Sequence, residues 1–384
     1  MSAPAISRSR RHLLLAGAAA GVSALAACVT PLVPVASTSP QRLRLLAEGR
    51  LAHRMAFQGS IVGGLSGIDF DPASGLWVAL SDDRSEILPA RLYTFAMDIV
   101  PGQRLQPRLR DAVTLRQAAG TPYPNRRAGG EVVDPEAIRF LPGGDRVLWA
   151  SEGDVVAGQH PSVRESKLDG TFVREFETPK ALRFGKPGTG PRSNDTFEGL
   201  ALTPDARGVW AAMETALAQD GPTARVGVPG GPCRFTLFDV ESGRAVRQIA
   251  YLPDSVPVAP MVPGGFVLNG VSEVLMIDAR RMLVLERSYS LGRGMSIRIY
   301  EIDVEDASDT LALDRLVAGQ YRPAPRKPVA DFARLGLSTV DNTEGMCWGP
   351  ALANGSRSLV FVSDDNFNPA QVTQFVACEF LDGA

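Results

Sequence analysis

The chain has 384 residues, of which 45% are hydrophobic and 21% are charged, and its formal net charge is −2. This balance is that of a globular protein with ample material for a core, and the lack of a long basic run after residue 28 argues against nucleic acid as a partner. The 38 glycines and 29 prolines indicate frequent turns and favour an all-β fold over a helical one.

The N-terminus has the pattern of an export signal. The segment "SRSRRHLLLAGAAAGVSALAAC" has a basic start and an apolar run of about fifteen residues, which is short for a membrane span. Arg10 and Arg11 resemble a twin-arginine signal, and the residues before Cys28 resemble a bacterial lipobox. We expect residues 1–27 to be removed and Cys28 to carry a lipid that holds the protein on the periplasmic face of the envelope. Val29 favours the outer membrane, and the alternative is a soluble periplasmic protein.

The rest of the chain is predicted to contain one folded domain. Residues 28–45, with "VTPLVPVASTSPQ", are predicted to be a flexible tether, and residues 46–384 the domain. We expect a monomer that meets the membrane only through its lipid. Cys233, Cys347 and Cys378 fit no zinc or redox spacing. A Cys347–Cys378 disulfide and free core cysteines both remain open.

A hairpin pattern recurs along the chain. Each copy has an apolar run, a turn rich in Pro, Asp, Gly or Asn, a second apolar run and a closing acid. The copies lie at 64–84, 135–154, 194–215, 272–289 and 343–366. The residue pairs that start and close them are Ser66–Asp82, Glu136–Glu152 and Glu198–Glu214, each 16 apart, Glu273–Glu286, 13 apart, and Glu344–Asp364, 20 apart. Because the two ends of an antiparallel hairpin meet, the spacing predicts that each pair lies at one end of its hairpin.

Further apolar strands follow each hairpin, so each unit is predicted to be an antiparallel sheet of three or four strands. The units start 62 to 75 residues apart, which predicts a β-propeller with five blades. A sixth could lie in the insertions at 100–135, 216–232 and 305–342. The early segment "RLRLLAEGRLAHRM" could add the fourth strand of the last sheet and close the ring. A β-sandwich is the alternative fold.

The closing acids are predicted to surround one mouth of the channel. Carboxylates this close repel one another unless cations compensate them, and calcium prefers such oxygens. The predicted metal ligands are Asp82, Glu136, Glu152, Glu198, Glu344 and Asp364. Further acids of the predicted ring are Glu214, Glu273 and Glu286, with Asp83 and Asp365 next to it and Asn194, Asn342 and Asn366 beside the acids. The alternative is that these acids cap turns or pair with arginine on a solvated rim.

The hairpins resemble a known family. "GGLSGIDFDPASGLWVALSDDR", "DPEAIRF", "FEGLALTPDARGVWAAMET" and "DNTEGMCWG" resemble the phytase-like domain, also called esterase-like activity of phytase, over residues 55–380. The resemblance implies ester hydrolysis and, through the β-propeller phytases, a calcium-dependent phosphomonoesterase with an acidic channel mouth. Its substrate would be a small-molecule ester or phosphoester. The sequence departs from the pattern at Ser66, where other blades have Glu.

Two functions from different classes are compatible with the sequence. The first is calcium-assisted phosphoester hydrolysis, with Glu198 and Glu214 as catalytic carboxylates and Arg84 and Arg287 neutralising the phosphate oxygens. The second is a non-catalytic, envelope-anchored binding propeller with structural calcium. The histidines of the mature chain, His53 and His160, lie in no R-H-G motif. A serine triad is disfavoured because "GLSGI" lacks the final glycine of a nucleophile elbow.

Overall fold

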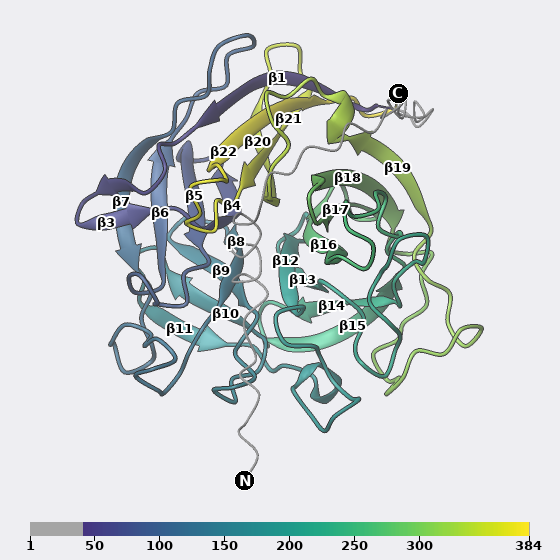
Figure 1. Cartoon of the computed structure of the whole chain (residues 1–384). Coiled ribbons are helices and arrows are strands. Elements are labelled where there is room, and N and C mark those ends of the chain that lie inside the picture. Colours follow the sequence, from purple (N-terminus) through teal and green to yellow (C-terminus); the bar gives the residue numbers. More distant parts are fainter. Residues whose placement is uncertain (1–40, 384) are drawn as a thin grey trace, which may run out of the picture. The chain divides into compact units, whose positions relative to one another are not determined.

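The computed structural model describes residues 41–383, so the predictions for the export signal, Cys28 and most of the tether lie outside it. The described residues form five four-stranded antiparallel sheets and one small hairpin (Figure 1). None of the helices in this part of the chain is long and apolar enough to cross a membrane. The fold is therefore all-β, as predicted.

The sheets follow one another along the chain, and we number them as blades 1 to 5. Blade 1 contains β4 (Leu65–Asp71), β5 (Leu76–Ser81), β6 (Arg91–Ala96) and β7 (Arg108–Thr114). Blade 2 contains β8 (Pro135–Phe140), β9 (Arg146–Ser151), β10 (Ser162–Lys167) and β11 (Phe172–Glu175), and blade 3 contains β12 (Phe197–Leu202), β13 (Gly208–Met213), β14 (Cys233–Asp239) and β15 (Arg244–Tyr251). Blade 4 contains β16 (Val267–Met276), β17 (Arg281–Ser290), β18 (Gly294–Asp303) and β19 (Arg326–Asp331).

Blade 5 combines the two ends of the described chain. It contains β20 (Thr343–Ala351), β21 (Arg357–Ser363), β22 (Gln374–Phe380) and, as its outer strand, β1 (Leu43–Arg50). β1 pairs antiparallel with β22, from Leu43 opposite Phe380 to Arg50 opposite Gln374. The predicted closing strand is thus confirmed, although it begins within the segment predicted as tether. The small hairpin β2 (Met55–Phe57) and β3 (Ser60–Val62) connects β1 to blade 1.

The first strand of each blade lies innermost. β4, β8, β12, β16 and β20 contact one another in sequence around the axis, and β20 returns to β4. The five counted blades are therefore confirmed as a propeller, and the described residues contain no sixth. Two of the predicted insertions instead supply outer strands, because 100–135 contains β7 and 305–342 contains β19.

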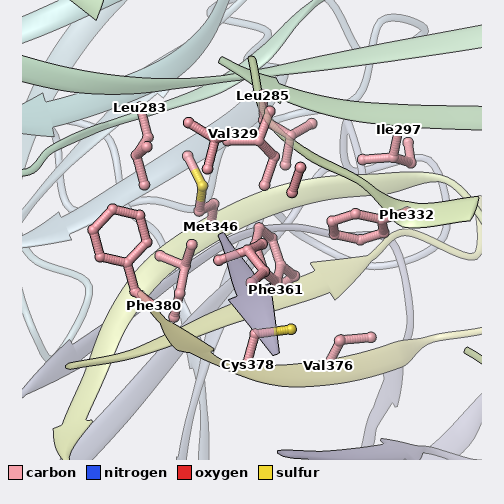
Figure 2. Packing of buried hydrophobic residues seen from close by; sticks show 14 of the residues in the cluster. Leu283, Leu285, Ile297, Val329, Phe332, Met346, Phe361, Val376, Cys378 and Phe380 are labelled. Carbon is pink, nitrogen blue, oxygen red and sulfur yellow. The ribbon is translucent and has the colours of Figure 1, made fainter. Parts of the chain in front are cut away.

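The core lies between the blades, where apolar side chains of neighbouring sheets interlock. Figure 2 shows one cluster, in which Leu285 and Ile297 of blade 4 meet Met346, Phe361 and Cys378 of blade 5. Cys347 belongs to another cluster, between blades 5 and 1. The two cysteines therefore face different sides of one sheet, and both are free, which excludes the disulfide that the sequence left open.

Candidate functional site

Each inner strand begins with the same irregularity. In blade 3, Phe197 lies opposite Met213 and Gly199 opposite Ala212, so that Glu198 between them has no residue across the ladder. The register shifts at the equivalent place in the other four blades. A β-bulge re-aims the extra residue's side chain. The bulged residues are Ser66, Glu136, Glu198, Ser272 and Glu344.

A second set of side chains comes from the second strand of each blade. Each of them directly follows the residue that pairs with the position just before the bulge, as Glu214 follows Met213, the partner of Phe197. The backbone N–H of Glu152 donates to Asp134 O at 2.9 Å, and that of Glu214 to Thr196 O at 2.6 Å, which holds these residues beside the bulge. The set is Asp82, Glu152, Glu214, Arg287 and Asp364. We call these ten residues, the bulged ones and this second set, the mouth ring. Seven of them are carboxylates.

Two acids predicted for the ring lie outside it. Glu273 follows the bulged Ser272, at the position that Gly67, Gly199 and Gly345 occupy in other blades. A Cβ on Gly345 would lie 2.7 Å from Ser66 O, because the inner strands approach closely there. Glu286 accepts from the hydroxyl of Tyr251 at 2.6 Å, in a network outside the ring. The sequence-based alignment of blade 4 was wrong by one residue, since a bulge cannot be read from hairpin spacing.

Glu273 instead meets Arg139 in the channel. Arg139 Nη2 lies 2.8 Å from Glu273 Oε2. Arg139 also donates to three inner-strand carbonyls besides that of its neighbour Ile138, namely Ile68 O at 2.9 Å, Val274 O at 3.1 Å and Met346 O at 3.0 Å. Glu273 Oε1 accepts the N–H of Leu200 at 2.9 Å. The pair therefore connects all five inner strands, three residues further along β8 than Glu136.

Six of the seven ring carboxylates, all except the predicted ligand Asp364, converge with Asp134 in three groups whose oxygens lie within 4.8 Å of one another. The groups are Asp82–Glu136–Glu344, Asp134–Glu136–Glu152 and Glu152–Glu198–Glu214. Glu136 and Glu152 each belong to two groups. All of these side chains are buried. Asp134 was missed by the sequence reasoning, although it stands two residues before Glu136, as Asn342 stands before Glu344.

The ring strongly disfavours full ionisation. Burial raises the pKa of Glu198 well above its usual value, and Glu214 and Glu152 raise it further, against the effect of Arg287. Burial also raises the pKa of Glu152 well above its usual value, together with Asp134 and Glu214. These are the shifts that uncompensated like charges produce in a dry site.

Arg287 supplies positive charge from within the ring. Its guanidinium lies 3.1 Å from Glu214 Oε1 and 3.2 Å from Glu344 Oε1, and it donates to Asn342 Oδ1 at 2.9 Å. Burial alone would lower the pKa of Arg287, but Glu344 and Glu214 outweigh it, so the pKa is raised. Arg287 thus occupies the place that an acid holds in the other four blades.

Arg84 supplies charge on another side of the mouth. It contacts Asp134 and Asn194, which belong to the segments leading into blades 2 and 3, and lies 4.0 Å from Glu152 Oε2. Its side chain is 14% exposed. Asn194 has a φ of 60°, a left-handed conformation that asparagine tolerates better than most residues. The structure therefore brings the two predicted arginines to the carboxylate groups from different blades.

The two acids next to the ring, Asp83 and Asp365, form contacts with neighbouring loop residues. Asp83 accepts from Arg91 at 2.8 Å and from the N–H of Leu88 at 2.9 Å. Asp365 accepts from the N–H of Gly64 at 3.0 Å and lies 3.2 Å from His53 Nδ1. The backbone N–H of Asn366 donates to Asp364 Oδ1 at 2.7 Å, while its side-chain amide donates to Gln371 at 3.3 Å.

A family model described as "Phytase-like: Esterase-like activity of phytase" matches residues 60–367. No curated protein matches the chain. Among solved structures, the one titled "Structure of Dos1 propeller" is 8% identical and covers 88% of this chain and 95% of its own, with a TM-score of 0.35.

Two further structures cover similar spans. Kuenenia stuttgartiensis hydrazine synthase is 14% identical over 83% of this chain and 98% of its own, with a TM-score of 0.33. The Pseudomonas aeruginosa periplasmic gluconolactonase PpgL is 15% identical over 84% of this chain and 87% of its own, with a TM-score of 0.32.

Proposed function

The chain belongs to the phytase-like family, and from this premise we propose that it hydrolyses phosphoric esters at the mouth ring, with calcium as its metal. One observation carries the proposal. Three buried carboxylate groups are joined through shared members, because Glu136 belongs to two of them and Glu152 to two. Two arginines, Arg84 and Arg287, contact the same groups. Adjacent cation sites beside fixed positive side chains suit a doubly charged phosphate, which needs charge compensation on several oxygens at once.

The ring residues fit calcium on three counts. All the donors are oxygens, which hard divalent cations prefer, and their spread over four of the five blades suits the variable geometry of calcium better than the strict octahedron of magnesium. Glu152 Oε2 and Glu344 Oε2 are buried and accept no hydrogen bond. Burial and neighbouring carboxylates raise the pKa values of Glu198 and Glu152, so a bound cation would favour their ionised forms. The ions would be held by the three carboxylate groups, namely Asp82–Glu136–Glu344, Asp134–Glu136–Glu152 and Glu152–Glu198–Glu214.

The arginines bind and orient the substrate in this proposal. When bound, calcium would neutralise charge at the phosphoryl oxygens and lower the pKa of water. Arg287 already lies between Glu214 and Glu344 and can turn one N–H towards a phosphoryl oxygen. Arg84, partly exposed beside Asp134, can do so from the other side. Fixed donors of this kind stabilise the charge of an in-line transition state without reorganising.

Glu198 is the proton acceptor in the proposed reaction. Water attacks phosphorus as the bond from phosphorus to the ester oxygen breaks. One water proton moves to the Glu198 carboxylate, the other stays on the product phosphate, and the departing oxygen takes up a proton from solvent water. Glu198 lies within 4.8 Å of Glu214, which pairs with Arg287, so a Glu198 oxygen that holds no ion can take this proton beside the bound phosphoryl group. Glu214, the partner of Glu198 in the hairpin, holds Arg287 in place, with Glu214 Oε1 3.1 Å from Arg287 Nη2.

A non-catalytic binding propeller is the second candidate, and one observation favours it. Arg287 already neutralises part of the ring through Glu214 and Glu344. In that case the carboxylates would hold calcium, or a cationic or sugar ligand, for binding alone. Where calcium is the ligand, the two candidates share the metal and differ in turnover.

The test combines calcium titration with ester hydrolysis. Chelator-stripped protein lacking residues 1–28 is titrated calorimetrically and then assayed on phosphate and carboxylic esters. We expect micromolar or tighter calcium binding, and at least about a 100-fold lower turnover in Glu198→Gln. Glu301→Gln is the control, because Glu301 is equally buried but pairs with Arg42 away from the ring.

Each result separates the candidates. Calcium binding without hydrolysis of any ester supports the binding propeller and overturns the enzyme. No calcium binding up to millimolar concentration overturns the metal site in both.

We further propose that Cys28 carries the lipid anchor and that the domain works in the periplasm. The support is the signal and lipobox pattern before Cys28. The intact mass of the mature protein tests it, since a mass without acyl chains would leave a soluble periplasmic protein.

A further inference from the structure

Blade 4 extends further past the mouth ring than the blade before it. In blade 3 the pairing of the two inner strands ends beside the bulge, at Phe197 and Met213. In blade 4 it continues for four more pairs, from Gly270 opposite Arg287 to Val267 opposite Ser290. β18 follows the extension to Gly294, opposite Ser290. At about 3.3 Å per residue, the three pairs beyond Arg287 rise roughly 10 Å above the ring.

One face of this extension is covered. Ser288 and Ser290 are buried, whereas Arg287 and Tyr289 are partly exposed, which is the period-two alternation of a strand with one covered face. Asn269 donates to Asp254 O at 3.0 Å, and the Ser290 hydroxyl donates to Val258 O. The segment 252–258 therefore packs on the face that carries Asn269 and Ser290.

The other face is apolar and continuous with the ring. Tyr289 lies opposite both Leu268 and Met295, and all three are partly exposed. The ring of Tyr289 is 6.0 Å from that of Phe266. Because directly opposed residues share a face, and residues two apart do as well, this set lies on the face of Arg287. Tyr289 lies two residues past Arg287 on β17, so this apolar set begins about 7 Å further from the ring than Arg287.

We propose that this apolar wall, formed by Leu268, Tyr289 and Met295, binds the organic group of the ester, so that the substrates carry an aromatic or bulky apolar group. The inference rests on the proposed function, because it places the phosphoryl group at Arg287. With that group held in the ring, an aromatic leaving group reaches Tyr289 along the same strand face. Aromatic and alkyl surfaces gain by leaving water against such a wall. A polyol that carries phosphates on every carbon offers it no apolar surface.

The test uses two non-hydrolysable probes that share one anionic group, phenylphosphonate and methylphosphonate. Calorimetry on calcium-loaded protein should show phenylphosphonate binding about 10-fold or more tightly than methylphosphonate. Tyr289→Ala should bring the two affinities within about threefold by weakening only phenylphosphonate. Tyr289→Phe keeps the ring and should keep the preference. Tyr321→Ala removes a half-buried tyrosine from the loop between β18 and β19 and should change neither affinity.

The outcomes are distinct for the two proposals. Equal affinities in the unmodified protein overturn the apolar subsite and leave phosphate binding at the ring intact. Binding of neither probe overturns the proposed function itself and the subsite with it. Equal weakening of both probes by Tyr289→Ala overturns the subsite in favour of a structural role. If Tyr289→Ala does not fold, Leu268→Asn on the same face replaces it in the test. This variant should show the same loss of preference for phenylphosphonate over methylphosphonate.

Discussion

Arg139 and Glu273 form a buried ion pair on the axis of the propeller, with Arg139 Nη2 2.8 Å from Glu273 Oε2. Both side chains are at most 3% exposed. Through their hydrogen bonds they reach all five inner strands, so one pair fastens the blades to one another below the mouth ring.

Replacing Arg139 should destabilise the whole propeller. Arg139→Met keeps the length of the side chain but leaves Glu273 and three inner-strand carbonyls without their donor. Breaking a buried pair in this way costs about 3–5 kcal/mol, measurable by urea denaturation. Arg280→Met is the control, because Arg280 forms its ion pairs in solvent and water screens them. Equal midpoints for the two variants would contradict the fastening role.

Glu273 should make stability depend on pH in a defined direction. Burial raises the pKa of Glu273 to about 7, against the opposing effect of Arg139. Between pH 4.5 and 7 the folded chain then holds a proton that the unfolded chain has lost. The free energy of unfolding should fall as the pH rises through this window, by at most about 1.4 kcal/mol per pH unit.

Denaturant titrations from pH 4.5 to 7, in saturating calcium to keep the ring ionised, measure this slope. Glu273→Gln cannot titrate and should reduce the slope, leaving the contribution of Asp69 and Glu286, whose pKa values burial also raises. Glu301→Gln should not, because Arg42 and Lys327 lower the pKa of Glu301 despite its burial and move its titration below the window. A slope that Glu273→Gln leaves unchanged would count against the raised pKa.

The shared carboxylates should dominate calcium binding. Glu136 belongs to two carboxylate groups and Glu214 to one. Glu136→Gln should therefore lower the affinity and the number of ions bound more than Glu214→Gln. At 100 times its Kd a single ion stabilises the fold by about 2.7 kcal/mol, so melting temperatures with and without calcium report the same ranking. Equal effects of the two variants would show that Glu136 serves only one ion.

Arg287→Gln should change metal binding and turnover in opposite directions. Without the guanidinium the ring repels cations less, and calcium should bind more tightly. In the proposed enzyme the same variant loses a phosphoryl donor, and kcat/KM on a phosphoester should fall by about 100-fold or more. Arg298→Gln is the control, because Arg298 pairs with Asp254 and Glu286 outside the ring. Tighter calcium with unchanged turnover would remove Arg287 from the reaction.

The repeat of apolar runs and turns predicted most of the architecture. Five hairpins of similar spacing indicated five blades, and an early apolar segment indicated the closing strand, which the structure shows as β1 on β22. Hairpin geometry also placed Glu198 and Glu214 at one end of their hairpin. These features are local, since strand period and turn chemistry are fixed within about twenty residues of chain.

The composition of the ring was decided by tertiary structure. A bulge in each inner strand selects which of two neighbouring residues faces the mouth, and in blade 4 it selects Ser272 and leaves Glu273 for the channel. The apolar wall arises because β16 and β17 keep pairing past the ring. The sequence determined where strands form and, in four of the five blades, which acids close the hairpins. Only the packing of five inner strands around one axis determined register, and a shift of one residue turns every side chain to the opposite face.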